Sequence, residues 1–200
     1  MMGKRGRFLV WIALLLLGVT LAAPQAGAEP LRLSPAQPQP DEAALRSGLR
    51  VAYAYPPDVK QLADAETWNH HYRKPGPPLV GFDYPDTDPG DRTLTSNVAT
   101  HVIAYIDGFV RFDRAGLWRI AFFSNDGLAV SIGGVLVYEH DGRHACQTLG
   151  WQEFAVPEPG WYAVEATFFQ RLNTACLMMR WAPPGDKMGW TPVDVYGFLP

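Results

Sequence analysis

The chain is organised around an apolar stretch at residues 116–137, which a single polar corner interrupts. Up to position 123, aromatic and β-branched residues are frequent and apolar residues occupy both alternating positions, which is typical of a strand packed on both faces. Small polar residues then interrupt the pattern at 124–127 (Ser-Asn-Asp-Gly). Two shorter strands are predicted at 128–132 and 135–139, because Gly133-Gly134 between them allows the positive φ angles of a tight hairpin turn. The polar corner is therefore the first candidate for a functional site.

Further strands are predicted by the same alternation along the rest of the chain. They cover residues 49–55, 101–105, 108–112, 150–156, 161–170 and 174–181, with turn-forming residues between them. Asp107-Gly108 is expected to form a turn or bulge between the second and third of these strands. Residues 58–68 have helical spacing, with Asp58 as the N-terminal cap. This pattern predicts an all-β fold, an antiparallel β-sandwich with one short helix in its N-terminal part.

The first 28 residues have the features of an export signal. Basic residues precede an uninterrupted apolar run at 8–23, and Ala26-Gly27-Ala28 fits the small-x-small pattern of a cleavage site. The run is short for a membrane span, so no span is expected after cleavage, and an uncleaved anchor is the alternative. Residues 29–47 are rich in proline and glutamine and predict an extended, mobile linker. The folded domain is then expected to cover residues 48–200.

The charge of the chain restricts the classes of partner, and its cysteine content indicates the cellular compartment. Cleavage of the signal removes three basic residues, which changes the formal charge from -3 to -6, with 14 Lys and Arg against 20 Asp and Glu. Such an acidic chain without a basic stripe is a poor binder of nucleic acid or of an anionic membrane. Cys146 and Cys176 both belong to the exported part, where an even pair predicts one disulfide, and two buried free thiols are the alternative. We therefore expect a secreted or periplasmic protein.

Other polar segments offer weaker metal chemistry. The loop at 74–91 carries four aspartates between positions 83 and 91, but it lacks the central glycine and distal glutamate of a helix-loop-helix calcium site. A solvated acidic loop is therefore favoured over a calcium loop. His140 and His144 share a loop that contains Gly142, so they are expected to face solvent rather than to bind zinc.

Catalytic patterns are missing from the sequence. No serine has the glycine-flanked elbow that exposes the nucleophile of a hydrolase. A glycosidase needs two carboxylates that face each other across a cleft, and nothing in the sequence pairs Glu153, Glu158 or Glu165. We predict that the chain is not an enzyme.

Five pieces of the sequence occur in the order of a known family. They are Gly108-Phe109-Val110, Gly116-Leu117-Trp118, FFSNDGLAVSIGGVLV at 122–137, WQEFAVPEPGWYAVEATFFQ at 151–170 and LMMRW at 177–181. Together they resemble the protective-antigen module (the PA-fourteen domain) of bacterial toxins, glycosidases, adhesins and yeast flocculins. The resemblance implies a β-sandwich that binds glycans or supports a neighbouring domain.

The resemblance also implies a calcium site at the polar corner. In family members that bind sugar, two consecutive aspartates joined by a cis peptide bond hold a calcium ion, which coordinates sugar hydroxyls directly. Asn125 and Asp126 match these positions and are the implied metal ligands. The amide of Asn125 brings no charge, and Ile132-Gly133-Gly134 lacks the family's aspartate, so calcium affinity should be weaker. The alternative is a plain turn in which Gly127 takes positive φ.

Two further residues are candidates for ligand contact. In the family, the loop that matches 139–144 lies near the sugar site, which makes Asp141 a secondary candidate. Trp151 lies near a strand end, where tryptophan can stack on a sugar ring, and burial in the core is the alternative. We expect Asp126 to lie at an accessible rim of the sandwich.

The sequence thus predicts an exported, non-catalytic carbohydrate-binding module, for which the resemblance implies calcium at Asn125 and Asp126 and a plain turn without metal is the alternative. Its expected ligand is a glycan or a cell-envelope polysaccharide. The alternative is a structural or adaptor domain that contacts a protein partner or the cell envelope.

Overall fold

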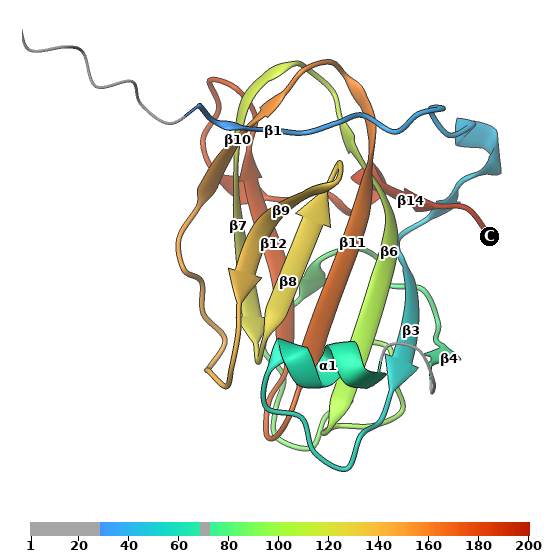
Figure 1. Cartoon of the computed structure of the whole chain (residues 1–200), viewed down its shortest axis with the longest axis vertical. Helices are drawn as coiled ribbons and strands as arrows, with labels where there is room; N and C mark the ends of the chain where they lie inside the picture. The colour runs from blue at the N-terminus through green and yellow to red at the C-terminus, as the bar shows by residue number, and fades with distance from the viewer. Residues whose placement is uncertain (1–28, 69–72) are drawn as a thin grey trace, which may run out of the picture.

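The computed structural model describes residues 29–68 and 73–200 as two stacked β-sheets with a short helix on one of them (Figure 1). The predicted signal peptide, residues 1–28, lies outside the described residues. In the described part of the chain, no helix has the length and apolar character needed to cross a membrane. The predicted all-β sandwich with one helix, α1 (Leu62–Trp68), is confirmed.

The first layer is a six-stranded sheet. Its strands are, in order, β1 (Leu31–Arg32), β10 (Gln152–Val156), β7 (Gly116–Asn125), β12 (Cys176–Ala182) and β13 (Gly189–Trp190), and β5 (Asp83–Tyr84) also pairs with β12. All of these pairs are antiparallel except β1 with β10.

The second layer is an eight-stranded sheet. Its strands are, in order, β2 (Arg46–Ser47), β14 (Tyr196–Phe198), β6 (Val102–Phe112), β11 (Gly160–Gln170), β8 (Leu128–Ile132) and β9 (Val135–His140), and β3 (Arg50–Ala54) pairs with β6 and with β4 (Lys74–Pro75). The long ladder between β6 and β11 runs from Val102 opposite Gln170 to Phe112 opposite Gly160. The short 3-10 helices η1 (Glu42–Ala44) and η2 (Val193–Val195) precede β2 and β14.

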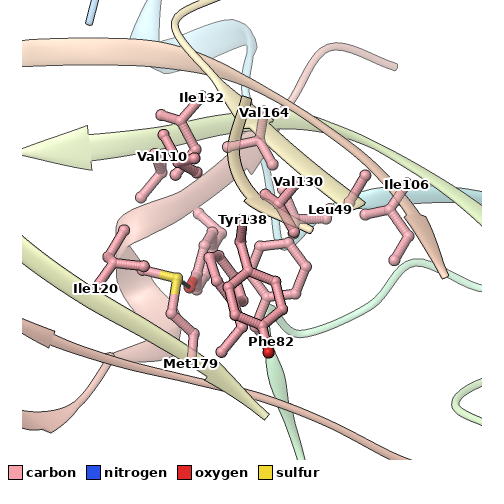
Figure 2. Close-up of a cluster of buried hydrophobic side chains, with 14 of the residues drawn as sticks. Leu49, Phe82, Ile106, Val110, Ile120, Val130, Ile132, Tyr138, Val164 and Met179 are labelled. Carbon is pink, nitrogen blue, oxygen red and sulfur yellow. Dashed lines mark hydrogen bonds between the residues drawn. The ribbon is translucent and has the colours of Figure 1, made fainter. Parts of the chain in front are cut away.

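The core lies between the two sheets. Successive side chains of a strand point to opposite faces, so every second residue of β8 and β11 is directed inward. Figure 2 shows Val130, Ile132 and Val164 of the eight-stranded sheet in one cluster with Ile120 and Met179 of the six-stranded sheet. Each fully buried aliphatic side chain contributes about 1.5–3 kcal/mol, so this cluster is the main stabilising feature of the fold.

The predicted strand pair at 101–105 and 108–112 is wrong, because both segments form the single strand β6. Gly108 does not turn the chain. A Cβ atom at this position would lie 2.8 Å from the carbonyl oxygen of Gly197 and 2.9 Å from a methyl group of Leu49. The glycine is therefore needed because β14 and Leu49 pack closely against β6.

The proline-rich segment 29–47 is extended but does not stand off as a mobile linker. Its strand β1 pairs with β10, and Leu33 is buried in the core. The side chain of Gln39 accepts a hydrogen bond from the backbone N–H of Trp161 (2.8 Å) and donates one to its carbonyl oxygen (3.0 Å). The segment has no apolar periodicity of its own. It nevertheless packs along the sandwich, because backbone groups of β10 and of Trp161 form hydrogen bonds with it.

The helix α1 is shorter than the predicted helix at 58–68, and Asp58 does not cap it. The Asp58 carboxylate accepts hydrogen bonds from Arg171 (2.7 Å) and from the N–H of Val59 (3.0 Å). This pairing with Arg171 lowers the pKa of Asp58. The N–H of Leu62, the first residue of the helix, is instead donated to the carboxylate of Asp141 (2.7 Å).

Candidate functional site

The polar corner connects the two layers of the sandwich. β7 ends at Asn125 in the six-stranded sheet, and β8 begins at Leu128 in the eight-stranded sheet, so the corner crosses between them. The Asn125–Asp126 peptide bond is cis, as the family resemblance implies. Gly127 does not take positive φ, so that part of the plain-turn interpretation is wrong. A Cβ atom on Gly127 would instead overlap the ring of Phe169, which packs directly on the corner.

Asp126 holds two loops together at this end of the sandwich. Its Oδ1 accepts a hydrogen bond from the backbone N–H of His144 (3.1 Å), and its Oδ2 accepts one from the N–H of Arg171 (2.9 Å). Its own N–H donates to the carbonyl oxygen of Phe169 (3.1 Å). Charge-assisted bonds of this kind are stronger than bonds between neutral groups. Asp126 therefore has a structural role whether or not it contacts a ligand.

The expectation that Asp126 lies at an open rim holds only in part. Only 5% of Asp126 and 7% of Asn125 is exposed. Both nevertheless line a hollow of about 720 Å³, together with Arg143, His144 and Thr174. The Nδ2 of Asn125 donates a hydrogen bond to Thr174 Oγ1 (2.8 Å). Among the described residues, no hydrogen bond is made to Asn125 Oδ1, so this oxygen can accept one from a ligand.

The predicted disulfide between Cys146 and Cys176 is confirmed, with the two Cα atoms 5.8 Å apart. Cys176 is the cross-strand partner of Asn125, so the bond attaches the loop 141–149 beside the hollow. Ser124 and Gln147 exchange two backbone hydrogen bonds of 3.2 Å and fix the same loop to the end of β7. These attachments position Arg143 and His144 at the hollow.

Asp141 and Trp151 do not meet the polar corner. The carboxylate of Asp141 accepts the N–H groups of Leu62 and Gly142 (2.7 and 2.6 Å), so it is occupied at the start of α1. Trp151 is 54% exposed and lies beside Arg119 on the outer face of the six-stranded sheet. Neither residue lines the hollow, so the prediction that both share a ligand with Asn125 is not supported by their positions.

His140 and His144 are not simply solvent-facing, contrary to expectation. Their rings stack with centroids 3.5 Å apart and planes 4° apart, and both residues are half-buried. Burial and the adjacent His144 lower the pKa of His140. The pair is thus a packing element of the loop that carries His144 to the hollow.

The aspartates of the loop 74–91 do not converge on the corner. Asp83 belongs to β5, and Asp91 accepts a hydrogen bond from the N–H of Asp88 (3.2 Å). Within residues 29–68 and 73–200, one group of three side chains of metal-binding type lies close together: Asp86, Cys146 and Cys176. The two sulfur atoms are bonded to each other in the disulfide, so they are not free to bind a metal ion. Glu153 and Glu165 lie on the outer faces of different sheets.

No protein-family model and no curated protein matches the sequence. Solved structures resemble the fold. The PA14 domain of the antifreeze protein MpAFP aligns with a TM-score of 0.66 at 15% identity, over 80% of this chain and 93% of that one. The PA14 sugar-binding domain of an RTX adhesin aligns with a TM-score of 0.59 at 15% identity, over 76% and 98% of the two chains. The chain has a PA14-type fold.

A yeast adhesin domain has a similar PA14-like architecture. The Epithelial Adhesin 9 A domain from Candida glabrata, in complex with Galβ1-3GlcNAc, aligns with a TM-score of 0.64 at 12% identity, over 86% of this chain and 96% of that one. At this identity the likeness establishes the fold. The family resemblance drawn from the sequence is thereby confirmed at the level of the PA14-type fold.

The hollow includes residues that the sequence did not single out. Arg143, Asn173 and Thr174 line it although they lie in loops of ordinary polar composition. Their positions depend on the disulfide and on the hydrogen bonds of Asp126, which join segments distant in sequence. Two expectations pointed toward these loops: the pairing of Cys146 with Cys176, and the resemblance that places the loop 139–144 near the sugar site.

The donor set at the corner fits calcium only as a weak site. Each carboxylate oxygen of Asp126 accepts one N–H and retains acceptor capacity, and Asn125 Oδ1 is free. Ca²⁺ takes six to eight oxygen ligands, and its affinity follows the number of charged ones. With one carboxylate, the ion would depend on neutral oxygens from the backbone, water or a ligand.

Proposed function

We propose that the chain is an exported, non-catalytic carbohydrate-binding module whose sugar site is the hollow beside Asn125 and Asp126. The observation that carries the proposal is the free Asn125 Oδ1 at a hollow lined by further hydrogen-bonding side chains. The RTX adhesin and Candida glabrata domains that share the fold are, respectively, a sugar-binding domain and a domain in complex with a disaccharide. The disulfide supports export, because such bonds persist in oxidising compartments.

Each lining group has a role in this proposal. Asn125 Oδ1 accepts a hydrogen bond from a sugar hydroxyl, while Arg143 and Asn173 donate to ring or hydroxyl oxygens. Thr174 keeps the Asn125 amide in place through its 2.8 Å hydrogen bond. Ca²⁺, when held by Asn125 and Asp126, would supply direct coordination to sugar hydroxyls. Asp126 also keeps the His144 and Arg171 backbones in position, which shapes the hollow.

Calorimetry with a glycan panel tests the proposal. The panel includes Galβ1-3GlcNAc, Galβ1-4GlcNAc and lactose, which are ligands in the adhesin complexes, together with cell-envelope oligosaccharides. Titrations are made with Ca²⁺ and with a chelator. Binding that Asn125→Ala weakens supports the proposal, and absence of binding to every glycan in both conditions overturns it.

A substitution that adds a charge separates calcium from the sugar contacts. Asn125→Asp places a second carboxylate beside Asp126 and should raise calcium affinity by about tenfold or more. Leu136→Ala, at an exposed position of the eight-stranded sheet, is the matched control and should leave binding at the hollow unchanged. If Asn125→Asp binds no calcium, the metal part of the proposal is wrong and the sugar part stands on the panel.

A structural or adaptor role is the second candidate. It requires exposed apolar surface, and the outer face of the six-stranded sheet carries the exposed side chains of Leu117, Trp151 and Trp190. This role predicts that substitutions on that face, and not at Asn125, change binding to the partner.

A further inference from the structure

Two exposed tryptophans lie in one row across the outer face of the six-stranded sheet. Trp190 is opposite Arg180, and Arg180 is opposite Ala121. The β10–β7 ladder ends where Gln152 pairs with Ile120, and Trp151 immediately precedes it, so its position lies just beyond the ladder, near the level of Ala121. The row is therefore Trp151, Ala121, Arg180, Trp190. It crosses three strand spacings, so the tryptophans are about 14 Å apart.

An arginine lies against each tryptophan. The guanidinium of Arg119 is 5.5 Å from the ring centre of Trp151, and that of Arg180 is 5.3 Å from the ring centre of Trp190. Arg119 donates a hydrogen bond to the carbonyl oxygen of Asp186 (3.1 Å), and Arg180 donates one to that of Met188 (3.0 Å). These contacts hold both cations in place on the face.

Neither arginine has a carboxylate partner in the described part of the chain. The nearby carboxylate of Asp186 pairs with Arg114 instead (3.5 Å). Neither guanidinium charge is therefore neutralised by a carboxylate of the described chain, and both can pair with an anionic ligand.

Exposed carboxylates lie on the same face, beside the row. Glu153 is opposite Arg119, and Asp83 is opposite Met178. The face therefore combines aromatic rings, unpaired cations and carboxylate acceptors. A chain of sugar rings that carries both carboxylates and hydroxyls matches all three kinds of group, because its carboxylates pair with arginine and its hydroxyls donate to Glu153 and Asp83.

We propose that Arg119, Trp151, Arg180 and Trp190, which we call the Trp–Arg face, bind a polysaccharide of uronic acids. The sugar rings lie against the two tryptophans, and the carboxylates of the sugars pair with the two arginines. The surface is separate from the hollow beside Asn125, with which it shares no lining residue. It thus adds a second binding function to the proposed one.

A protein partner fits this face less well. A stable protein interface needs a continuous, well-packed core of about 800 Å² on each side, and charged residues are depleted from that core. Here the two tryptophans are separated by Ala121, which is 7% exposed, and by Arg180. A chain-like ligand can contact separated rings along a row, whereas a protein core requires them to be contiguous.

Oligogalacturonate is the probe for a direct test by calorimetry, in the presence of a chelator so that no calcium site contributes. Its fully methyl-esterified form has the same rings without the charges, and poly-L-glutamate has the charges without the rings. We expect binding to oligogalacturonate that weakens with added salt, and at least about tenfold weaker binding of the ester, because a charge-assisted hydrogen bond contributes more than 1 kcal/mol.

Variants assign the binding to the Trp–Arg face. Arg119→Gln with Arg180→Gln, and separately Trp151→Ala with Trp190→Ala, should each weaken binding about tenfold or more. Trp190→Phe retains a ring and should retain most of the affinity. Arg111→Gln and Leu136→Ala, exposed positions of the eight-stranded sheet, are the matched controls. Both tryptophans are more than half exposed and lose only surface ring contacts, so melting temperatures within several degrees of the unaltered chain are expected, and a cooperative transition shows that the variants fold.

Each other outcome overturns the proposal. Absence of binding to oligogalacturonate, or equal binding of the ester, removes the charged-sugar ligand. Equal binding of poly-L-glutamate, unchanged by the tryptophan substitutions, favours an acidic protein partner. Asn125→Ala should leave oligogalacturonate binding unchanged, because Asn125 lies at the hollow and not on the Trp–Arg face. A failure of the proposal for the Trp–Arg face can therefore be told apart from a failure of the proposed sugar site at the hollow.

Discussion

The two sheets of the sandwich use their outer faces in opposite ways. On the eight-stranded sheet, α1 lies across the outer face (Figure 1). It covers Ile103 and Phe169, and the hydroxyl of Tyr105 donates a hydrogen bond to the carbonyl oxygen of Ala65 (2.6 Å). On the six-stranded sheet, Trp151 and Trp190 are 54% and 57% exposed. Both faces carry aromatic residues, so aromatic content does not decide which face is buried. A face is buried where another segment of the chain, such as α1, lies over it.

The same comparison corrects one prediction from the sequence. The apolar residues at 117–123 indicate a strand packed on both faces, but only the core side of β7 is buried throughout. On the outer side, Ala121 is 7% exposed, whereas its neighbours are not fully buried. The outward residues of β7 include Leu117, which is 47% exposed, and Arg119. No described segment covers this face, and the arginines shield the apolar rings only in part. A strand with apolar residues on both faces therefore indicates either burial or a binding surface.

The largest expected effect is on the covered face. Phe169→Ala removes a fully buried ring beneath α1 and should lower the free energy of unfolding by about 3–5 kcal/mol. Trp190→Ala on the open face removes only ring contacts with Phe123 and Arg180 and should lower it by about 1 kcal/mol. Urea unfolding of both variants measures the contrast. Similar losses in the two variants would contradict the distinction between a covered and an open face.

Loss of the disulfide should be the next largest effect. Cys146→Ser with Cys176→Ser opens a link between residues 30 positions apart, which should lower the free energy of unfolding by about 3–4 kcal/mol. Because the link attaches the loop beside the hollow, glycan binding there should weaken as well. Binding of oligogalacturonate to the Trp–Arg face should persist in the variant wherever it remains folded. Equal loss at both surfaces would show that the two are not independent.

A smaller effect is expected where α1 is attached. Asp141→Ala removes the acceptor of the Leu62 N–H and should cost about 1 kcal/mol, by analogy with loss of a helix cap. Asp141→Asn retains an acceptor oxygen and should recover most of the stability. Hydrogen exchange of α1 should become faster in the alanine variant. Unchanged exchange would mean that α1 is held by its packing alone.

The smallest expected effect is a pH dependence from His140. Its pKa is lowered below the ordinary value of 6.5, so the unfolded chain binds the proton more readily than the folded chain. The free energy of unfolding should therefore decrease as the pH falls below about 6.5, the pKa of the unfolded-state histidine. Asp58, whose pKa is also lowered from 3.8, loses its contribution only at more acidic pH. Melting temperatures between about pH 7.5 and 5.5 should fall less in His140→Gln than in the unaltered chain.

Much of the fold was predictable because its signals are local. The hairpin at Gly133-Gly134 needs two positive φ angles, which are 56° and 76°, and adjacent glycines announce them. The long strands β7 and β11 follow from alternation within each segment. The misassigned turn at Gly108 was not predictable, because that glycine is required by the approach of Gly197, which is distant in sequence.

The candidate site was predictable only at its centre. Asn125 and Asp126 were found from their pattern and from the resemblance to the family, and the structure places both at the hollow. Asp141 was assigned to the site from the position of its loop, yet its carboxylate binds the N–H of Leu62 in α1. Asp141 and His144 lie in the same loop but face different parts of the molecule. The carboxylate of Asp141 accepts the Leu62 N–H, and this donor belongs to a segment distant in sequence.

By itself, the sequence determined the alternating strands, the tight hairpin, the pair of cysteines and the polar residues at the corner. The tertiary structure decided which strands share a sheet, which outer face α1 covers, and which loops meet at Asp126. The physical reason is the range of the interactions. Alternation and turn chemistry act between neighbours along the chain, whereas burial and the satisfaction of polar groups depend on segments that only the completed fold brings together.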